Sequence, residues 1–368
     1  MNLGINTSHI LITLIIILMS IFYKILNSAN KSSTRIIDNI KNITMAESEH
    51  FVLNESPSKK PLPIFFFSHG GPDFADGLDN PGAWETTKKV GRYIQNKIKP
   101  DFIIVVSAHW QTNKPDEIEV ALPGIGEAWY TQNSVTSKKI RSDENGLIYD
   151  YYGFPKRFYE TQFHTVPNKF IANDIVKTLK ESDWFQSKTQ ERGIDHGVFV
   201  PLKVAFGDPT IADSNKLDVE VPLIQVSLAG TSDIEIHYRL GEALSKYRDL
   251  NGAILFSGMS VHNLRDHHMA RALGNKPLHY NKPFHEIINK LLLDTKHEDQ
   301  LEALKQLPRN PEWKEIYKAA HPTNEHLLPA IVAAGASRGD ECKLLYGDEA
   351  GSLGWNIYSW GSTDGLDI

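Results

Sequence analysis

The sequence predicts an α/β fold in which one central sheet, mixed but mostly parallel, is flanked by helices in a single domain. Between residues 61 and 368, short apolar runs alternate with longer stretches of helical pattern. The runs are apolar at nearly every position, which is typical of strands covered on both faces. Three of these runs lead into a histidine, which predicts a metal site at the carboxyl ends of the strands.

The elements of this fold can be assigned in order along the chain. The predicted strands are the apolar runs at residues 64–67, 102–107, 221–228 and 253–256. The predicted helices cover residues 83–97, 169–180, 234–247, 282–293 and 325–336. Pro329 is close enough to the start of the last helix to be tolerated there.

Residues 1–60 precede the predicted catalytic domain, residues 61–368, and have a different character. Residues 10–23 are uncharged and nearly all apolar, and the run extends to residue 26 past one lysine. It is shorter than the ~20 residues of a comfortable membrane span, and basic residues follow it rather than precede it. We interpret residues 10–26 as a candidate membrane tether that leaves the domain in the cytosol, followed by a polar linker. Without insertion, the protein is expected to be cytoplasmic.

The composition excludes several classes of protein. The net charge of −6 and the lack of a long basic stripe argue against nucleic acid as a partner. The single cysteine, Cys342, excludes a disulfide framework, a cysteine zinc ribbon and an iron–sulfur cluster. The chain has fifteen histidines. A metal would therefore have to be held by imidazole and carboxylate, ligands that suit zinc and non-haem iron.

Three histidines follow predicted strands and form the candidate metal site. They are His69 in SHGG, His109 in SAHW and His262 in SVHN. Because ligands bind beyond the carboxyl ends of strands in an open α/β sheet, these side chains could converge on one ion. Gly70 and Gly71 support this, since glycine permits a tight turn and a close approach of the backbone. The alternative is three separate hydrogen-bonded histidines.

Two further clusters contain histidine. His196 lies in an Asp-His-Gly segment interpreted as a defined loop, where Asp195 either orients the imidazole or caps a turn. The segment HPTNEHLLPA carries His321, Glu325 and His326. It indicates either a functional role or the start of a helix, with Thr323 or Asn324 as the N-cap. His267 and His268 are interpreted as surface or pocket rim.

Motifs of other enzyme classes do not occur in the sequence. There is no glycine-rich phosphate loop and no His-Glu-x-x-His segment. Ser68 and Ser107 lack the Gly-x-Ser-x-Gly context of a nucleophilic serine, which argues against a serine hydrolase.

Five motifs together resemble a known family. SHGGP, SAHWQ, DHGVFVPL, SGMSVHNLRD and HPTNEHLLPA occur in the order seen in class III extradiol ring-cleavage dioxygenases, of the 4,5-DOPA dioxygenase extradiol type. The segment YYGFPKRFY at residues 151–159 is similar to that family's Gly-Phe-Pro segment. The resemblance covers roughly residues 61–360, and the joint order of the motifs is more specific than any one of them.

The resemblance implies an activity and the roles of individual residues. It implies that His69, His109 and His262 bind one divalent metal, and that His196 is an acid/base or an additional ligand. Fe(II) is the ion expected for dioxygenase chemistry, and Zn(II) is an ion the site would also hold. The substrates would be O2 and a small aromatic diol, a DOPA-like catechol. Aromatic residues expected to hold its ring are Trp110, Trp129, Tyr151, Tyr152 and Phe154.

Two alternatives to a dioxygenase remain open from the sequence. Three histidines and a water also form a hydrolytic zinc site, so a zinc-dependent hydrolase is one alternative. The other is a non-catalytic binding protein like the related Memo family. Metal dependence and oxygen uptake distinguish these classes.

Overall fold

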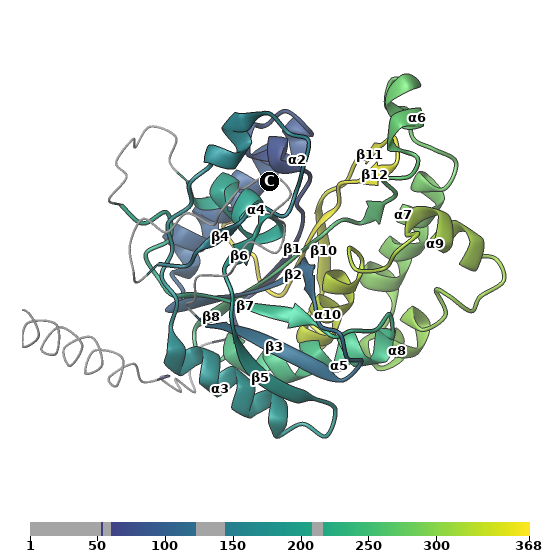
Figure 1. The fold of residues 1–368 in the computed structure, drawn as a ribbon. Coiled ribbons are helices and arrows are strands. Elements are labelled where there is room, and N and C mark those ends of the chain that lie inside the picture. Colours follow the sequence, from purple (N-terminus) through teal and green to yellow (C-terminus); the bar gives the residue numbers. More distant parts are fainter. Residues whose placement is uncertain (1–52, 54–59, 123–143, 208–215) are drawn as a thin grey trace, which may run out of the picture. The chain divides into compact units, whose positions relative to one another are not determined.

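An eight-stranded sheet organises the computed structural model, which describes residues 53, 60–122, 144–207 and 216–368 (Figure 1). The strand order is β10-β13-β1-β8-β2-β7-β3-β5. β1 (Ile64–Ser68), β8 (Gly252–Gly258), β2 (Phe102–Gln111) and β7 (Leu223–Leu228) form its parallel centre. The outer strands are β3 (Glu117–Leu122), β5 (Gln186–Glu191), β10 (Cys342–Tyr346) and β13 (Ile357–Trp360), with antiparallel pairs at β3–β7, β1–β13 and β10–β13. The predicted mixed, mostly parallel sheet is confirmed.

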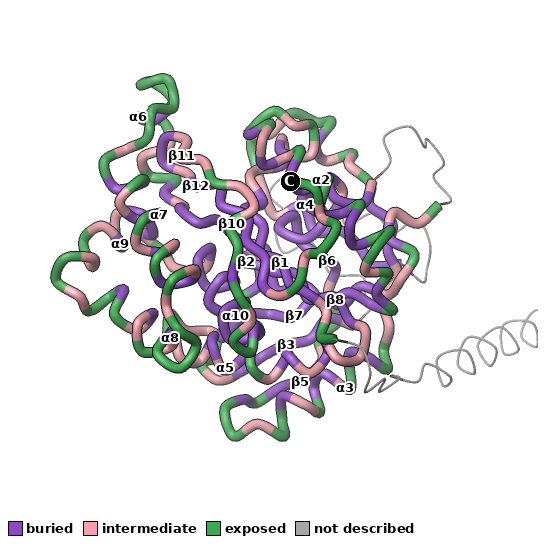
Figure 2. Tube along the Cα trace, turned by 180° about the vertical axis from the view of Figure 1, so that it is seen from behind, coloured by how far each residue is buried: buried purple, intermediate pink, exposed green. Residues whose placement is uncertain are grey.

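Helices cover both faces of this sheet (Figure 1). α2 (Pro81–Tyr93) and α4 (His196–Phe206) pack on one face, where alternate residues of the central strands, such as Phe65 and Val105, join their core. α5 (Ile234–Leu244) and α10 (Leu328–Ala336) pack together on the other face. The central strands are therefore buried on both sides, as Figure 2 shows. Further α-helices in the described part of the chain are α3 (Lys169–Lys180), α6 (His267–Ala272), α7 (Asn281–Asn289), α8 (His297–Leu304) and α9 (Lys314–Ala320).

Two small sheets lie beside the main one. β9 (Val261–His262) pairs with β12 (Leu353–Gly354), which pairs with β11 (Glu349–Ala350). β4 (Leu147–Ile148) pairs with β6 (Ile194–Asp195). β9 carries His262, and β6 leads directly into α4. These short pairings therefore position His262 and the start of α4.

Two expectations about local structure are wrong. The Asp-His-Gly segment is not a loop, because His196 is the first residue of α4. Its preceding residue, Asp195, is extended (φ −84°, ψ 174°), as is usual at an N-cap. The last predicted helix starts at Leu328 instead of residue 325, and its N-cap is Leu327 rather than Thr323 or Asn324. His326 therefore lies in the turns that precede α10.

No helix in the described ranges is long and apolar enough to cross a membrane. The predicted tether at residues 10–26 lies outside those ranges.

Candidate metal centre

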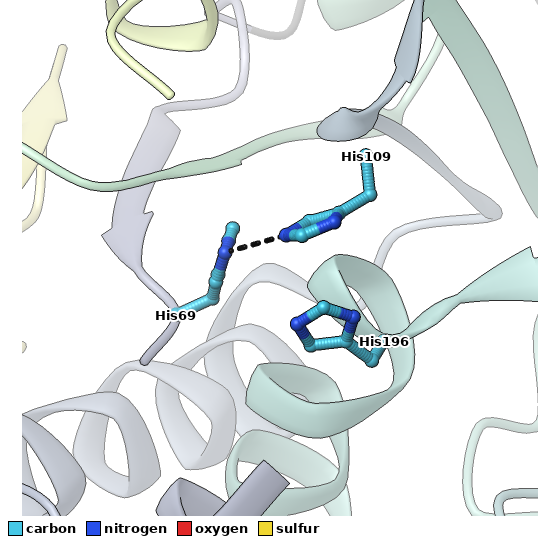
Figure 3. Close-up of side chains that lie close together, drawn as sticks. All are labelled: His69, His109 and His196. Carbon is cyan, nitrogen blue, oxygen red and sulfur yellow. Dashed lines mark hydrogen bonds between the residues drawn. The ribbon is translucent and has the colours of Figure 1, made fainter. Parts of the chain in front are cut away.

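Three histidines from separate elements lie together at the carboxyl end of the parallel strands (Figure 3). His69 follows β1, His109 is near the end of β2, and His196 begins α4. Each offers a ring nitrogen, and these three atoms lie within 4.8 Å of one another. The Nε2 atoms of His69 and His109 are 3.1 Å apart. We call His69, His109 and His196 the first group.

The spacing of the nitrogens suits ligands of one ion. Two imidazole nitrogens bound ~2.0–2.1 Å from a metal at angles of about 90–110° lie about 2.8–3.4 Å apart. The His69–His109 separation falls in this interval, and so does the 3.3 Å between the Nε2 atoms of His109 and His326. The donor set therefore fits a divalent metal that accepts imidazole.

His262 is not one of the three residues of the first group and lies against His326. Its ring stacks on that of His326, with centroids 3.5 Å apart and an interplanar angle of 15°. With Glu325, these two histidines form a second cluster of possible ligand atoms. We call His262, Glu325 and His326 the second group. His326 connects the groups, since its Nε2 faces His109.

A proline in α4 helps to orient His69. Pro201 has no backbone N–H, so the carbonyl of Gly197, four residues earlier, lacks its helical partner. The hydroxyl of Ser257 donates to that carbonyl instead. Its oxygen is thereby left to accept from Nδ1 of His69, 2.9 Å away. This arrangement puts the proton of His69 on Nδ1 and leaves the Nε2 lone pair to face His109.

One largely enclosed carboxylate, that of Asp150, contacts both other members of the first group. Oδ1 of Asp150 accepts from the backbone N–H of His196 at 3.0 Å and from its Nδ1 at 2.7 Å. Oδ2 lies 3.1 Å from Nδ1 of His109. The start of α4 can approach His109 closely because residue 197 is a glycine. A Cβ at Gly197 would lie 2.8 Å from the His109 ring. Asp150 was not identified from the sequence, although it directly precedes the YYGFP segment.

The electrostatics follow from burial and from Asp150. Burial alone would raise the pKa of Asp150, but His196 and His109 outweigh it and hold this pKa well below its usual range. Burial would lower the pKa of His109, but the Asp150 charge and hydrogen bond raise it. For His69 and His326, burial and the neighbouring histidines hold the pKa well below 6.5. Both are therefore neutral at pH 7, as metal ligands must be.

Asp195 neither orients His196 nor caps a turn with its side chain. Its carboxylate accepts from the Ser107 hydroxyl at 2.7 Å and from Arg192 at 3.1 Å. Arg192 also donates to the carbonyl of His109 at 3.3 Å. This buried network lies beneath the first group and holds the end of β2.

The aromatic residues proposed from the sequence differ in position. The ring of Tyr151 meets that of His196 edge-on, with centroids 5.3 Å apart, and Phe154 packs on Tyr151 at 5.6 Å. Tyr152 is 86% exposed. Trp110 is buried beneath the Arg192 guanidinium, which lies 4.6 Å from its ring centroid. Tyr151 and Phe154 are thus beside the first group, and Trp129 lies outside the described residues.

His321, His267 and His268 lie outside both groups. His321 is buried, and its Nε2 contacts the carbonyl of Ser260 at 2.9 Å. His267 and His268 begin the short helix α6. Glu325 accepts from Nδ1 of His326 at 3.0 Å and from the Thr323 hydroxyl at 2.8 Å.

Comparison with known proteins adds an independent line of evidence. The sequence profile of the family described as "Catalytic LigB subunit of aromatic ring-opening dioxygenase" matches residues 63–361. A 4,5-DOPA dioxygenase extradiol-like protein of Schizosaccharomyces pombe is 31% identical over 303 residues, covering 78% of this chain and 89% of that protein. A 4,5-DOPA dioxygenase extradiol of Beta vulgaris is 28% identical over 310 residues, covering 81% and 96%.

A solved structure shows the same fold. The crystal structure of the uncharacterized protein JW3007 from Escherichia coli K12 superposes with a TM-score of 0.54 at 21% sequence identity. The match covers 82% of this chain and all of that one.

Proposed function

Because the chain belongs to the family of the catalytic LigB subunit of aromatic ring-opening dioxygenases, we propose that it opens the ring of a small catechol with O2 at a metal held by His69 and His109 of the first group and by neighbouring histidines. The observation that supports this most is the position of His109, whose Nε2 lies 3.1 Å from Nε2 of His69 and 3.3 Å from Nε2 of His326. A DOPA-like catechol is the proposed substrate, since relatives named for 4,5-DOPA cover most of the chain.

The proposed ligands are His69 and His109. His326 is a further proposed ligand because its Nε2 faces that of His109. His262 is also proposed, because the family resemblance implies it. When bound, Fe(II) would bring the diol and O2 together and pass electron density between them, whereas Zn(II) would occupy the site without that redox chemistry. Because the proposed ligands are neutral imidazoles, they would leave the positive charge of the ion uncompensated, which would favour the deprotonated form of a diol in the site.

His196 is the proposed acid/base. Its Nδ1 is engaged by Asp150, so Nε2 is the atom available to take a phenolic proton and later to return one. Because His196 lies in the first group, it is also a candidate additional ligand of the metal. Of the aromatic residues expected from the sequence to hold the substrate ring, which include Trp110, Tyr152 and Phe154, the geometry favours Tyr151 and Phe154: Tyr151 borders His196, and Phe154 packs on Tyr151.

The test is oxygen uptake by the full chain loaded with Fe(II) without air and then given a panel of catechols. We expect one O2 consumed per ring-opened product, seen as a yellow chromophore, and no uptake with the Zn(II)-loaded protein. His164→Gln is a suitable control, because His164 is a buried histidine paired with Glu144 outside both groups. Absence of uptake with every catechol would refute the proposal, and Zn(II)-dependent turnover without O2 would favour a hydrolase.

A further inference from the structure

We infer that Asp150 is a positioning residue that fixes the ring tautomers of His109 and His196, so that both Nε2 lone pairs are available to the metal and substrate. This inference rests on the proposed function of the first group. It concerns a side chain that neither the sequence motifs nor the comparisons assign.

Both oxygens of the Asp150 carboxylate face hydrogen-bond donors. Oδ1 of Asp150 receives two donors from one residue, the backbone N–H and Nδ1 of His196. Oδ2 faces Nδ1 of His109. An ionised carboxylate is an acceptor at both oxygens, so each imidazole must carry its proton on Nδ1. The Nε2 atom of each neutral ring then has a free lone pair.

The location of Asp150 favours its role in fixing the two ring tautomers. Its side chain is 11% exposed, and it lies at the N-terminus of α4, where the backbone N–H groups favour an anion. Water therefore has little access to replace the carboxylate. Nε2 of His109 lies 3.1 Å from Nε2 of His69 and 3.3 Å from Nε2 of His326. If His109 carried its proton on Nε2, that proton would point at these two proposed ligands.

Asp150→Asn gives a specific outcome. The backbone N–H of His196 is always a donor, so the amide oxygen should remain on that side and keep the His196 tautomer. The amide NH2 would then face Nδ1 of His109. Because two donors cannot pair, His109 should move its proton to Nε2, which removes its lone pair from the proposed metal position.

Two measurements on the full chain test the inference. The first is ¹⁵N NMR of histidine rings in metal-free protein at mildly alkaline pH. Wild type should show His109 and His196 with Nδ1–H, and Asp150→Asn should change His109 alone. The second is Co(II) affinity, which should fall about 10- to 100-fold in the variant, as for other residues that orient metal ligands.

Glu144→Gln is the matched control, since it alters another buried carboxylate paired with an imidazole, His164, at 3.0 Å. It should change neither the His109 tautomer nor Co(II) affinity. An Nε2–H tautomer for His109 in wild type overturns the inference even if Asp150→Asn fails to fold, and so does a variant with unchanged tautomers and affinity. Neither readout needs ring cleavage, so an inactive wild type with the expected tautomers would refute only the proposed function.

Discussion

The two groups of ligand atoms use a carboxylate in different ways. In the first group, Asp150 is 11% exposed and contacts two imidazoles and a backbone N–H. In the second group, Glu325 is 27% exposed and contacts one imidazole, that of its neighbour His326. The first group is built on strand ends and a helix start, whereas His326 lies in turns before α10. A buried carboxylate shared by two rings constrains both, while a neighbouring one in a turn constrains one.

This difference predicts an order of importance. His109 has the most connections, because it faces His69 and His326 through Nε2 and Asp150 through Nδ1. Substitution of His109 should therefore affect metal binding more than substitution of any residue of the second group.

The largest effect is expected for His109→Ala. Removing this ring takes away the nitrogen that faces both His69 and His326, so Co(II) or Fe(II) affinity should fall more than about 100-fold, beyond the loss typical of residues that only orient ligands. Metal titration against a competing chelator measures it. His164→Ala, which removes a buried histidine elsewhere, should leave the affinity unchanged. Tight binding by His109→Ala would show that the first group is not the metal centre.

His196→Gln should separate chemistry from binding. Without an acid/base, kcat should fall about 10²- to 10⁴-fold. Metal affinity should stay close to that of wild type if His196 acts only on protons. Steady-state oxygen uptake and metal titration on the same preparation give both values. A parallel loss of metal would instead assign His196 as a ligand.

Within the second group, His326→Gln and Glu325→Gln should differ. His326→Gln removes the nitrogen that faces His109, and we expect roughly a tenfold loss of metal affinity, at the lower end of losses at metal sites. Glu325→Gln should have little effect, because the amide oxygen can still accept from Nδ1 of His326. An effect of Glu325→Gln as large as that of Asp150→Asn would remove the distinction between the two carboxylates.

The last prediction concerns stability in acid rather than metal binding. Burial lowers the pKa of His321 to about 4, from its ordinary 6.5. Below pH 6.5 the unfolded chain takes up a proton that the folded chain resists until about pH 4, so the free energy of unfolding falls as the pH falls through this interval. His321→Gln should make that fall shallower, by roughly 1.4 kcal/mol per unit of pKa difference. Urea unfolding of metal-free protein at several pH values tests this, and identical slopes would contradict it.

The sequence was informative where regular elements carry the site. Runs such as those ending at His69 and His109 predicted strands because both faces of the central sheet are buried, so nearly every position is apolar. The edge strand β5 (QSKTQE) was missed, because an exposed edge needs no apolar run. The start of α4 was missed as well, since Pro201 within the helix obscures its pattern.

The rest of the site depends on contacts between distant residues. Asp150 meets His196 across 46 positions, and Ser257 meets His69 across 188. No spacing along the chain encodes such contacts, since they follow from which strands become neighbours. The stacking of His262 on His326 likewise follows from the pairing of β9 with β12 and from the turns before α10.

X-ray absorption on the Fe(II)-loaded full chain tests the central claim most directly. If His69, His109 and His326 hold the ion, the spectrum should show scattering from at least three imidazole rings, with nitrogens about 2.0–2.2 Å from the metal. His109→Ala should lose at least one of them in whatever metal remains bound. A shell of oxygen ligands without imidazole scattering, or a spectrum unchanged by His109→Ala, would contradict the account.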